Sequence, residues 1–271
     1  MHFGSAHIEQ FRNDGYTSLP RLFTEDEVLA LQREVERFRQ LGFGRNVRTD
    51  GDGATHSQEK TNYQVIPLYD KSDLIRALPF EPKVLELVTQ LIGDPFLLHL
   101  DQLFLKPAGQ GTGTDWHQDN AYFKIADPAK GVAMWVAVHD ATVANGTLHV
   151  VPGSFREQYD HHRDPYSDHH IHCQPPEERA VAIEVPAGGA AFFCYGCAHC
   201  TRDNTTDRER AGIAFHFLNA DFASPDLLEG ERAKPLLTGP LATGGLKEYG
   251  VTVAGTWPAE VGRVLAAPAL S

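Results

Sequence analysis

The stretch FLLHLDQLFLKPAGQGTGTDWHQD, residues 96–119, joins a strand-like apolar run to the triplet His117-Gln118-Asp119. Residues 96–106 are rich in side chains that favour strands, and a further strong strand candidate follows at 132–138. On a β-strand, residues i and i+2 face the same way, so we expect His117 and Asp119 to present an imidazole nitrogen and a carboxylate oxygen to one point. The pattern therefore predicts a pair of metal ligands held rigidly inside a sheet.

His199, which lies 80 residues after Asp119, is the third candidate ligand, and a second strand would bring it to the first two. Two histidines and one carboxylate occupy one face of an octahedral ion and leave the opposite three positions open, as in non-haem Fe(II) oxygenases. The open positions would accept a bidentate 2-oxo acid and dioxygen. We therefore expect His117, Asp119 and His199 to form a catalytic Fe(II) site with 2-oxoglutarate and O₂ as co-substrates.

Arg210 is the candidate anchor for the co-substrate. The turn-like residues 203–206 lie between strand-like segments at 190–197 and 211–218, and a hairpin centred between Asn204 and Thr205 would place His199 directly opposite Arg210. Side chains so paired have Cβ atoms about 4.5–5.5 Å apart. A planar, charged guanidinium there would suit the distal carboxylate of 2-oxoglutarate. The alternative is a surface charge paired with Asp207 or Glu209, which the apolar residues after Arg210 disfavour.

Together these residues resemble the phytanoyl-CoA dioxygenase family of Fe(II)/2-oxoglutarate-dependent oxygenases. The resemblance runs from about residue 5 to about residue 222 and is carried by Trp116-His117-Gln118-Asp119, Trp135, Asn145-Gly146-Thr147-Leu148, Pro152-Gly153-Ser154, and His199 followed by Arg210. It implies that His117, Asp119 and His199 bind iron and that Arg210 anchors 2-oxoglutarate. It also implies that Trp135 lines the same pocket, and Lys60 falls near a family position that contacts the co-substrate. Gln102 and Asn120 are further candidates for contacts near the iron.

Two short segments depart from the family pattern. Pro152-Gly153-Ser154-Phe155 stands where the family often has Pro-Gly-Ser-His, and His199-Cys200-Thr201 stands where it often has His-Gly-Ser. Neither change touches a proposed ligand. Because residues around these positions border the pocket mouth, the departures concern the identity of the substrate.

The order of predicted elements favours one mainly β domain over residues 1–271. A helical support at about 5–93 includes a helix at 8–13, a capping box at Thr24–Glu27 that opens an amphipathic helix, and a helix from Pro82 to Gly93. Strands are expected at roughly 96–106, 115–124, 131–139, 146–151, 180–185, 190–199 and 210–218. Their number and spacing, within a core at about 96–222, predict a double-stranded β-helix (jelly roll, cupin-like) with flanking helices. A loop-rich tail, with some order around Trp257, would follow.

Charge and hydropathy exclude several partners. The 271 residues contain 24 basic and 36 acidic side chains, a net charge of −12, which argues against nucleic acid or an anionic membrane as partner. There is no apolar run of about 18 residues, and the N-terminus lacks the features of a signal peptide. We therefore expect a cytoplasmic protein that binds a small molecule, with its oligomeric state left open.

Four cysteines raise a competing metal hypothesis. Cys194, Cys197 and Cys200 have the spacing Cys-x-x-Cys-x-x-Cys, and Cys173 lies upstream. Iron–sulfur and zinc sites use similar spacings. On a strand, however, residues three apart point to opposite faces, and no further cysteine follows Cys200. Buried free thiols are the favoured interpretation.

Residues 155–179 form a long segment rich in histidine and aspartate between predicted strands. It contains a second His-x-Asp triplet, His162-Arg163-Asp164, in a polar stretch that indicates a loop rather than a ligand pair. Long loops inside compact domains often cover binding sites, so we expect a polar lid that faces the substrate. A second metal site in this loop is the alternative.

The function hypothesis is a dioxygenase that oxidises an unactivated C–H bond of a small natural product, by hydroxylation or ring closure. The polar loop and the acidic balance favour a polar or sugar-containing substrate, such as an aminoglycoside-like compound, over a fatty acyl-CoA. Lipid, terpenoid and amino-acid substrates remain alternatives within the family. The rival from another class is a non-catalytic jelly-roll module that binds a metal without turnover, which the complete ligand set disfavours.

Overall fold

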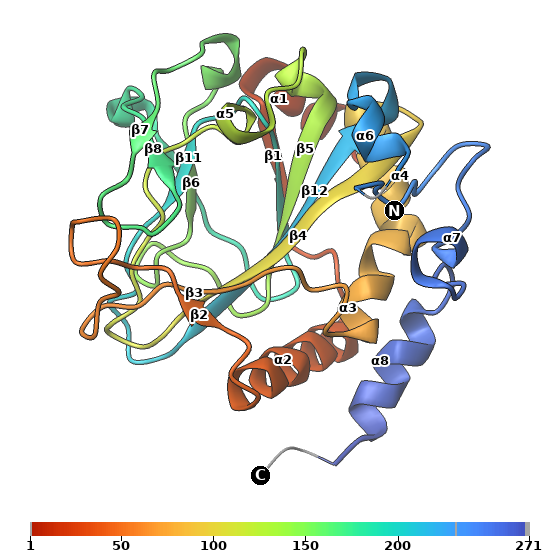
Figure 1. The fold of residues 1–271 in the computed structure, drawn as a ribbon, viewed down its shortest axis with the longest axis horizontal. Helices are drawn as coiled ribbons and strands as arrows, with labels where there is room; N and C mark the ends of the chain where they lie inside the picture. The colour runs from red at the N-terminus through yellow and green to blue at the C-terminus, as the bar shows by residue number, and fades with distance from the viewer. Residues whose placement is uncertain (1, 231, 269–271) are drawn as a thin grey trace.

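The computed structural model describes residues 2–230 and 232–268, and its centre is a pair of facing antiparallel sheets (Figure 1). The larger sheet has the order β1 (Tyr16–Leu19), β10 (Ala190–Cys194), β5 (Gly131–Ala137), β12 (Arg210–Asn219), β4 (Phe96–Lys106), β3 (Tyr63–Val65) and β2 (Arg45–Asn46). The smaller sheet has the order β11 (His199–Thr201), β6 (Leu148–Val150) and β9 (Val181–Ile183). A separate ribbon pairs β7 (His162–Arg163) with β8 (Ile171–His172). The predicted jelly roll is therefore confirmed.

Helices cover one side of the larger sheet and both ends of the chain contribute to them. The eight helices in the described ranges are α1 (Ser5–Asp14), α2 (Glu25–Gln40), α3 (Asp73–Ala77), α4 (Pro82–Ile92), α5 (Asn120–Phe123), α6 (Pro225–Leu228), α7 (Leu246–Tyr249) and α8 (Trp257–Ala266). Helix α4 packs against β5 and β12, and α1 packs against β10. None of the helices in residues 2–230 and 232–268 is long and apolar enough to cross a membrane.

Strand β12 shows how the alternation of side chains separates the core from the site. Ala211, Ile213, Phe215 and Phe217 are buried in the main hydrophobic core. The alternate residues Arg210, Ala214 and His216 line a cavity between the two sheets instead. Because side chains of one strand point alternately to its two faces, a single strand both seals the core and supplies polar groups to the cavity.

The segment that follows Trp116 does not form the predicted strand at 115–124. His117 makes only an isolated bridge with His199, and the chain then turns into the short helix α5. Asp119 is the N-cap residue of this helix and has helical dihedral angles, φ −57° and ψ −33°. The residues that suggested one strand belong to two elements, the bridge at His117 and the helix α5. No strand forms because the backbone pairing ends after His117.

The predicted hairpin between the strands of His199 and Arg210 is also wrong. Strand β11 pairs with β6 in the smaller sheet, whereas β12 pairs with β4 and β5 in the larger sheet. The connection between β11 and β12 therefore crosses from one sheet to the other. Asn204 holds this crossing, because its side-chain amide donates to the carbonyl oxygens of Lys106, Pro107 and Arg208. Turn-forming residues between two strands indicate a reversal of the chain but not which strands pair.

The C-terminal tail is more ordered than expected, because Trp257 opens helix α8 and is buried against the N-terminal helices. Its indole Nε1 donates to Glu27 Oε1 at 2.6 Å. Glu27 also completes the predicted capping box with Thr24 and accepts from Lys83 Nζ at 2.7 Å. Burial raises the pKa of this carboxyl group, but the contacts with Lys83, Trp257 and Thr24 outweigh burial and hold the pKa below its usual value. One carboxylate thus connects α2, α4 and α8.

We expect Glu27→Gln to lower the free energy of unfolding by about 1–2 kcal/mol at pH 7, because charge-assisted hydrogen bonds to three elements are weakened. A lowered pKa in the folded state contributes stability above the ordinary pKa of the carboxyl group, and this contribution is lost as the pH falls. The difference between variant and wild type should therefore shrink towards about pH 3. Urea unfolding at both pH values measures it, with the exposed Glu178→Gln as control. A difference that does not change with pH would contradict the role of the charge.

Candidate functional site

Three candidate ligands from two distant parts of the chain converge at the cavity between the sheets. The ligand atoms of His117, Asp119 and His199 all lie within 4.8 Å of one another, and all three residues are buried. Asp119 Oδ1 is 3.7 Å from His117 Nε2 and 3.8 Å from His199 Nε2. Within the described part of the chain, no other group of histidine, cysteine and acidic residues converges in this way. The structure therefore brings these three side chains together, as the sequence predicted.

The backbone orients both imidazole rings. The Nδ1–H of His117 donates to the carbonyl oxygen of Asp115 at 2.8 Å, and that of His199 donates to the carbonyl oxygen of Cys197 at 3.0 Å. This leaves the lone pair of each Nε2 directed to the common point. Burial lowers the pKa of His117 to about 3 and also lowers the pKa of His199. Both rings are therefore neutral at pH 7, which is the form that binds a metal ion.

His216 contacts the carboxylate from the larger sheet and is a site residue that the sequence analysis missed. Its Nε2 lies 3.2 Å from Asp119 Oδ2, while Oδ1 faces the two other imidazoles. Burial raises the pKa of Asp119, but His199 and His216 outweigh burial and hold the pKa below its usual value. Asp119 is therefore ionised, with one oxygen held by His216 and the other free for a metal ion. The signal was present, since residues 210 and 216 lie on the same face of one predicted strand.

Gln118 anchors the turn between the two ligands. Its side-chain amide donates to the carbonyl oxygens of Glu157 and Gly196, both at 2.7 Å, and its Oε1 accepts from the backbone of Tyr159 at 3.1 Å. The backbone N–H of Gln118 donates to His161 Nε2 at 3.0 Å. The middle residue of the triplet thus fixes the turn to the segment after β6. The strand pattern predicted from the sequence gave this residue no role, because its hydrogen-bond partners come from elsewhere in the chain.

Arg210 is fully buried at the other end of the cavity and lacks a charged partner among the described residues. Its Nη2 donates to the carbonyl oxygen of Gly146, while its Nε and Nη1 have no hydrogen-bond partner. Burial lowers the pKa of Arg210 to about 9, so the guanidinium stays charged at neutral pH. A buried cation with two free donors is matched by a carboxylate.

Two glycines allow the close packing around this guanidinium. A Cβ on Gly146, whose φ is +76°, would lie 2.0 Å from the carbonyl oxygen of Arg202. A Cβ on Gly212 would lie 2.5 Å from the indole of Trp135, whose ring faces Arg210 with a centroid distance of 5.5 Å. Trp135 therefore lines the cavity as expected, and it packs against the arginine that would hold the co-substrate.

Lys106 is a second buried cation that the sequence analysis missed, and it pairs with Arg210 across β4 and β12. Its Nζ donates to Thr201 Oγ1 at 2.8 Å and to the carbonyl oxygen of Arg202. Burial, followed by the charge of Arg210, lowers the pKa of Lys106 well below its usual value. Two basic side chains thus lie on paired positions of β4 and β12, and an anionic ligand beside Arg210 would offset the repulsion between them.

The cavity has a volume of about 390 Å³, enough for a small co-substrate beside a small substrate. Gln102 lines it, as predicted, and accepts a hydrogen bond from Gln64. Two other predicted contacts are not brought to it. Asn120 uses its side chain to cap the backbone of Ile125, and Lys60 is exposed on a loop outside the cavity. The expectation for Lys60 rested on the family resemblance alone, and Asn120 turns away because it lies in α5 rather than in a strand.

The segment at 155–179 borders the cavity mouth. His169 and His170 line the cavity, and the hydroxyl of Tyr122 in α5 accepts a hydrogen bond from the backbone of Ile171 at 2.9 Å. In the second His-x-Asp triplet, His162 is exposed and the Asp164 carboxylate accepts from the backbone of Tyr166. The triplet therefore does not form a ligand pair. The lid remains a prediction, to which this position adds support.

The four cysteines are buried free thiols, as favoured from the sequence. Burial raises the pKa of Cys173 and of Cys200 to about 12, so both are protonated at neutral pH. Metal-bound cysteines are thiolates. Cys197 packs beneath Ser154, whose hydroxyl donates to the carbonyl oxygen of Val151. The Cys-x-x-Cys-x-x-Cys spacing therefore has a packing role here.

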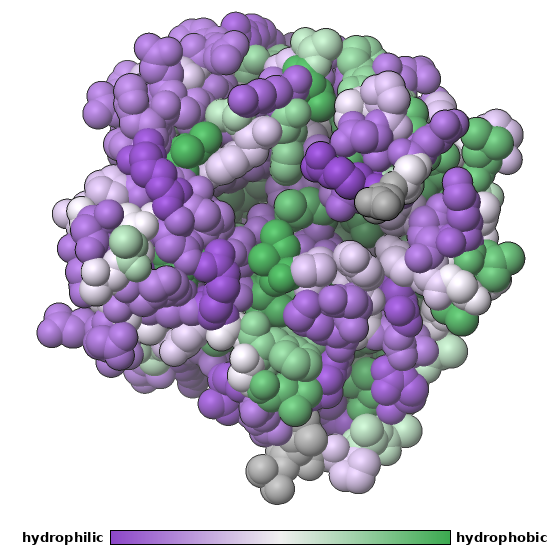
Figure 2. Space-filling view, viewed as in Figure 1, coloured by the Kyte–Doolittle hydropathy of each residue, from purple (hydrophilic) through white to green (hydrophobic). Residues whose placement is uncertain are grey.

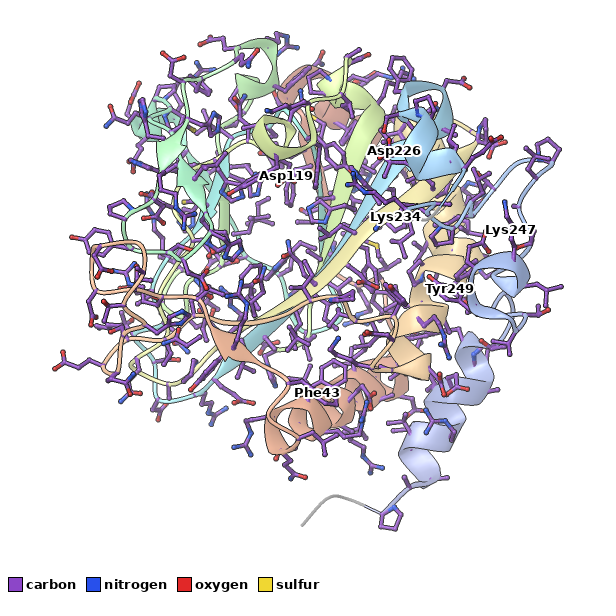
Figure 3. The ribbon with its side chains drawn as sticks, in the orientation of Figure 1. Phe43, Asp119, Asp226, Lys234, Lys247 and Tyr249 are labelled. Atoms are coloured by element: carbon purple, nitrogen blue, oxygen red, sulfur yellow. The ribbon has the colours of Figure 1, made fainter. Side chains whose placement is uncertain are left out.

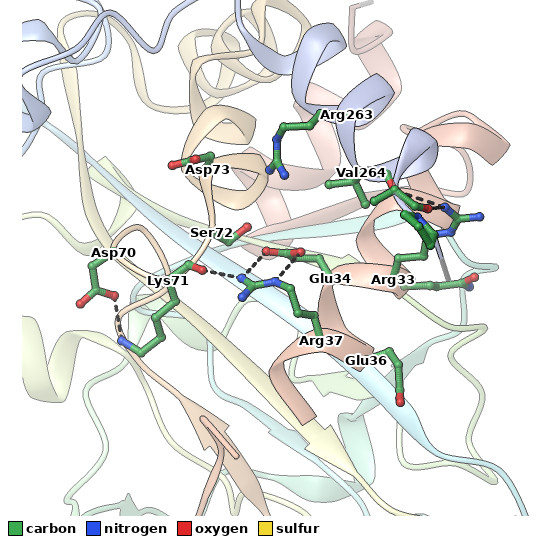
Figure 4. Close-up of a pocket in the computed structure, with 13 residues that line it drawn as sticks. Arg33, Glu34, Glu36, Arg37, Asp70, Lys71, Ser72, Asp73, Arg263 and Val264 are labelled. Atoms are coloured by element: carbon green, nitrogen blue, oxygen red, sulfur yellow. Dashed lines mark hydrogen bonds and ion pairs between the residues drawn. The ribbon is translucent and has the colours of Figure 1, made fainter. Parts of the chain in front are cut away.

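A second large cavity, of about 700 Å³, lies between α2, α3 and α8 (Figure 4). It is lined by charged side chains, but these are paired with one another. Arg37 binds Glu34 and Lys71 binds Asp70, while Arg33 donates to the carbonyl oxygens of Val264 and Leu265. Because the charges at this cavity are already satisfied, it offers a ligand much less than the cavity at Asp119 does.

Comparisons with known proteins agree with this geometry. The sequence model of the phytanoyl-CoA dioxygenase (PhyH) family matches residues 11–212. An ectoine dioxygenase of Nocardia farcinica is 27% identical over 254 residues, which cover 82% of this chain and 83% of that protein. Among solved structures, the 2-oxoglutarate-dependent carbocyclase SnoK of nogalamycin biosynthesis has a TM-score of 0.72 at 21% identity, with 87% of this chain and 97% of SnoK covered. EctD from S. alaskensis, solved with 2-oxoglutarate and 5-hydroxyectoine, has a TM-score of 0.64 at 21% identity, with 81% of this chain and 77% of EctD covered.

We expect His216→Phe to weaken Fe(II) binding by about 10–100-fold, because the carboxylate of Asp119 loses the donor that orients it. His216→Gln should restore part of the affinity, since an amide N–H can replace the imidazole donor. Anaerobic titration with Fe(II) measures both without turnover. An affinity in His216→Phe equal to that of the wild type would show that the contact does not position the carboxylate.

Proposed function

Since this chain belongs to the phytanoyl-CoA dioxygenase family and is an iron- and 2-oxoglutarate-dependent dioxygenase, we propose that His117, Asp119 and His199 bind its Fe(II) and that Arg210 anchors its 2-oxoglutarate. One observation carries this assignment: the three ligand atoms and the guanidinium with two free donors border the same cavity. The donor set fits Fe(II), because two neutral imidazoles and one carboxylate leave coordination positions for co-substrates.

When bound, Fe(II) with 2-oxoglutarate and O₂ supplies an oxidant that attacks an unactivated C–H bond, while 2-oxoglutarate is converted to succinate and CO₂. The residues of the chain position the reactants and exclude water. His216 holds one oxygen of Asp119, so the carboxylate offers its other oxygen to the metal. Arg210 and Trp135 hold the co-substrate at the end of the cavity remote from its mouth, and the apolar walls keep water from the site.

We propose that the substrate is a small hydroxyl-bearing natural product, oxidised by hydroxylation or ring closure. Gln64, Gln102 and Tyr122 offer hydrogen bonds near the mouth, while Leu100 and Phe104 provide apolar surface for a ring. A sugar-like ring with hydroxyl groups matches this mixture. Asp119, a proposed iron ligand, is the one carboxylate among the described lining residues, so the cavity favours hydroxyl groups over the cationic amines of an aminoglycoside. The relatives named for ectoine and for nogalamycin biosynthesis are consistent with a small-molecule substrate.

His117→Ala or Asp119→Ala should abolish formation of succinate from 2-oxoglutarate with added Fe(II), because each removes one of three ligands. His162→Ala is the matched control, since it alters the exposed second His-x-Asp triplet. Succinate is quantified over time, and circular dichroism verifies folding. Full turnover in either ligand variant would contradict the assignment.

Arg210→Ala should raise the concentration of 2-oxoglutarate needed for half-maximal succinate formation by on the order of 30-fold or more. Loss of one partner of a desolvated charge pair costs roughly 2–5 kcal/mol. The exposed Arg208→Ala, two residues away, should leave this concentration unchanged. An unchanged requirement in Arg210→Ala would mean that another residue anchors the co-substrate.

A further inference from the structure

We propose that the substrate space continues beyond the metal cavity into a second chamber, where Lys234 binds an oxyanion group carried by the substrate. This inference rests on the proposed function, because it extends the same cavity. The chamber has a volume of about 380 Å³. Ile66 and Leu100 line both spaces, so the two adjoin along a shared apolar wall.

The chamber exists because the larger sheet loses a strand at this point. Strand β3 ends at Val65, which pairs with Leu103, and the next bridge on that side of β4 joins Leu97 to Leu236, so residues 99–102 have no paired strand there. The segment at 232–236 passes over this edge, where the backbone N–H of Leu98 donates to the carbonyl oxygen of Pro235. Tyr249 of α7 closes the far side. The edge of β4 is therefore unpaired only between the bridge at Leu97 and the end of β3, and the chamber lies at this gap.

A β-bulge in β4 directs side chains toward both spaces. His216 pairs with Leu100 and Phe217 pairs with Leu98, so His99 is the extra residue of β4. Bulges re-aim side chains next to active sites. Here the consecutive residues His99 and Leu100 both border the second chamber, and Leu100 also borders the metal cavity. The bulge lies opposite His216, the residue that holds Asp119, so the junction of the two spaces is beside the proposed iron ligand.

Lys234 is the basic group in this chamber whose ammonium makes no direct contact with an acidic side chain. It is partly buried, and its Nζ makes no hydrogen bond or ion pair in the structure as described, although it lines the chamber. Of the nearby acidic groups, Asp101 accepts from the backbone of Leu68 and Tyr69 and interacts with Lys234 only as a more distant charge, while Glu248 accepts from Thr243. An ammonium group that is partly removed from water and has no direct ion pair favours an anion beside it.

The other basic groups in the chamber agree with this role. Arg232 also lines it and pairs at 3.3 Å with Asp226, an exposed contact that an incoming anion can share. Burial lowers the pKa of His99 to about 4, so this ring is neutral at pH 7 and adds no charge. The ligand chemistry is therefore one oxyanion held by an ammonium group, with a guanidinium near the entrance.

Two views in the same orientation show the face of the molecule that carries these residues. In Figure 3, Lys234 lies between Asp119 and Tyr249 in the view. Figure 2 shows this face hollowed near its centre, with hydrophobic residues in and beside the hollow. A fitting substrate would place its ring near the metal and its apolar middle over Ile66 and Leu100. Its oxyanion, such as a carboxylate, would then reach Lys234.

The test uses two fluorescent probes with the same rings on protein loaded anaerobically with Fe(II) and 2-oxoglutarate. The anionic probe is 8-anilinonaphthalene-1-sulfonate, and the neutral probe is N-phenyl-1-naphthylamine. We expect Lys234→Gln to weaken binding of the anionic probe by about tenfold, as for a partly desolvated ion pair, and to leave the neutral probe unchanged. Lys247→Gln, an exposed lysine on α7, is the control and should change neither affinity. Millimolar inorganic phosphate should not displace the anionic probe, because the site recognises an oxyanion attached to a ring.

Three results would overturn the inference: equal binding of the anionic probe by wild type and Lys234→Gln, an equal loss for both probes, or displacement of the anionic probe by phosphate. The first excludes the charge, the second indicates a structural disturbance, and the third indicates a site for free anions. Absorbance of the Fe(II)–2-oxoglutarate complex, recorded in the same samples, separates this inference from the proposed function. Its absence in the wild type would refute the iron and co-substrate assignment, whereas its presence with any of the three results refutes the second chamber alone.

Discussion

The backbone bridge between His117 and His199 is the contact on which the rest of the site depends. The N–H of each residue donates to the carbonyl oxygen of the other, at 3.0 and 2.9 Å. This one antiparallel pair joins the segment after β4 to the smaller sheet and places the two imidazoles with ring centroids 4.2 Å apart. The chain must turn directly after the bridge, and the turn brings Asp119 to face both rings. A bridge of one residue therefore sets the positions of three ligand atoms.

Charge is distributed between two ends of one cavity. The ionised carboxylate of Asp119 lies with neutral imidazoles at one end, and the guanidinium of Arg210 lies at the other. Among the described residues, neither Asp119 nor Arg210 forms an ion pair with a lysine, an arginine or an acidic side chain. A divalent cation and a dicarboxylate would complete both ends, since buried charges are costly unless they are paired. Leaving these groups unpaired is energetically costly, and hydrogen bonds from Gln118 and Asn204 to the backbone hold the segments that carry them in place.

Local patterns in the sequence predicted the elements well and their partners poorly. The helix at Pro82–Ile92 and the strand at Phe96–Lys106 match their predicted limits, because caps and alternation are properties of neighbouring residues. The hairpin register for His199 and Arg210 was wrong, although both side chains reach the same cavity from facing sheets. Gln118 and Lys106 had no assigned role, because their hydrogen-bond partners are far away in the chain. His216 could have been found, since it shares a strand face with Arg210.

The sequence by itself determined the candidate metal ligands, the charge of the proposed anchor and the mainly β architecture, because residue chemistry and short-range periodicity depend only on neighbouring residues. Only the tertiary structure decided which strands pair, that Asp119 caps a short helix, and that His216 holds its second oxygen. It also decided where β3 ends and hence that a second chamber adjoins the cavity. These features depend on contacts between residues many positions apart in the chain. Such contacts form, and stabilise the fold, only when the two sheets and the segments that cover them pack together.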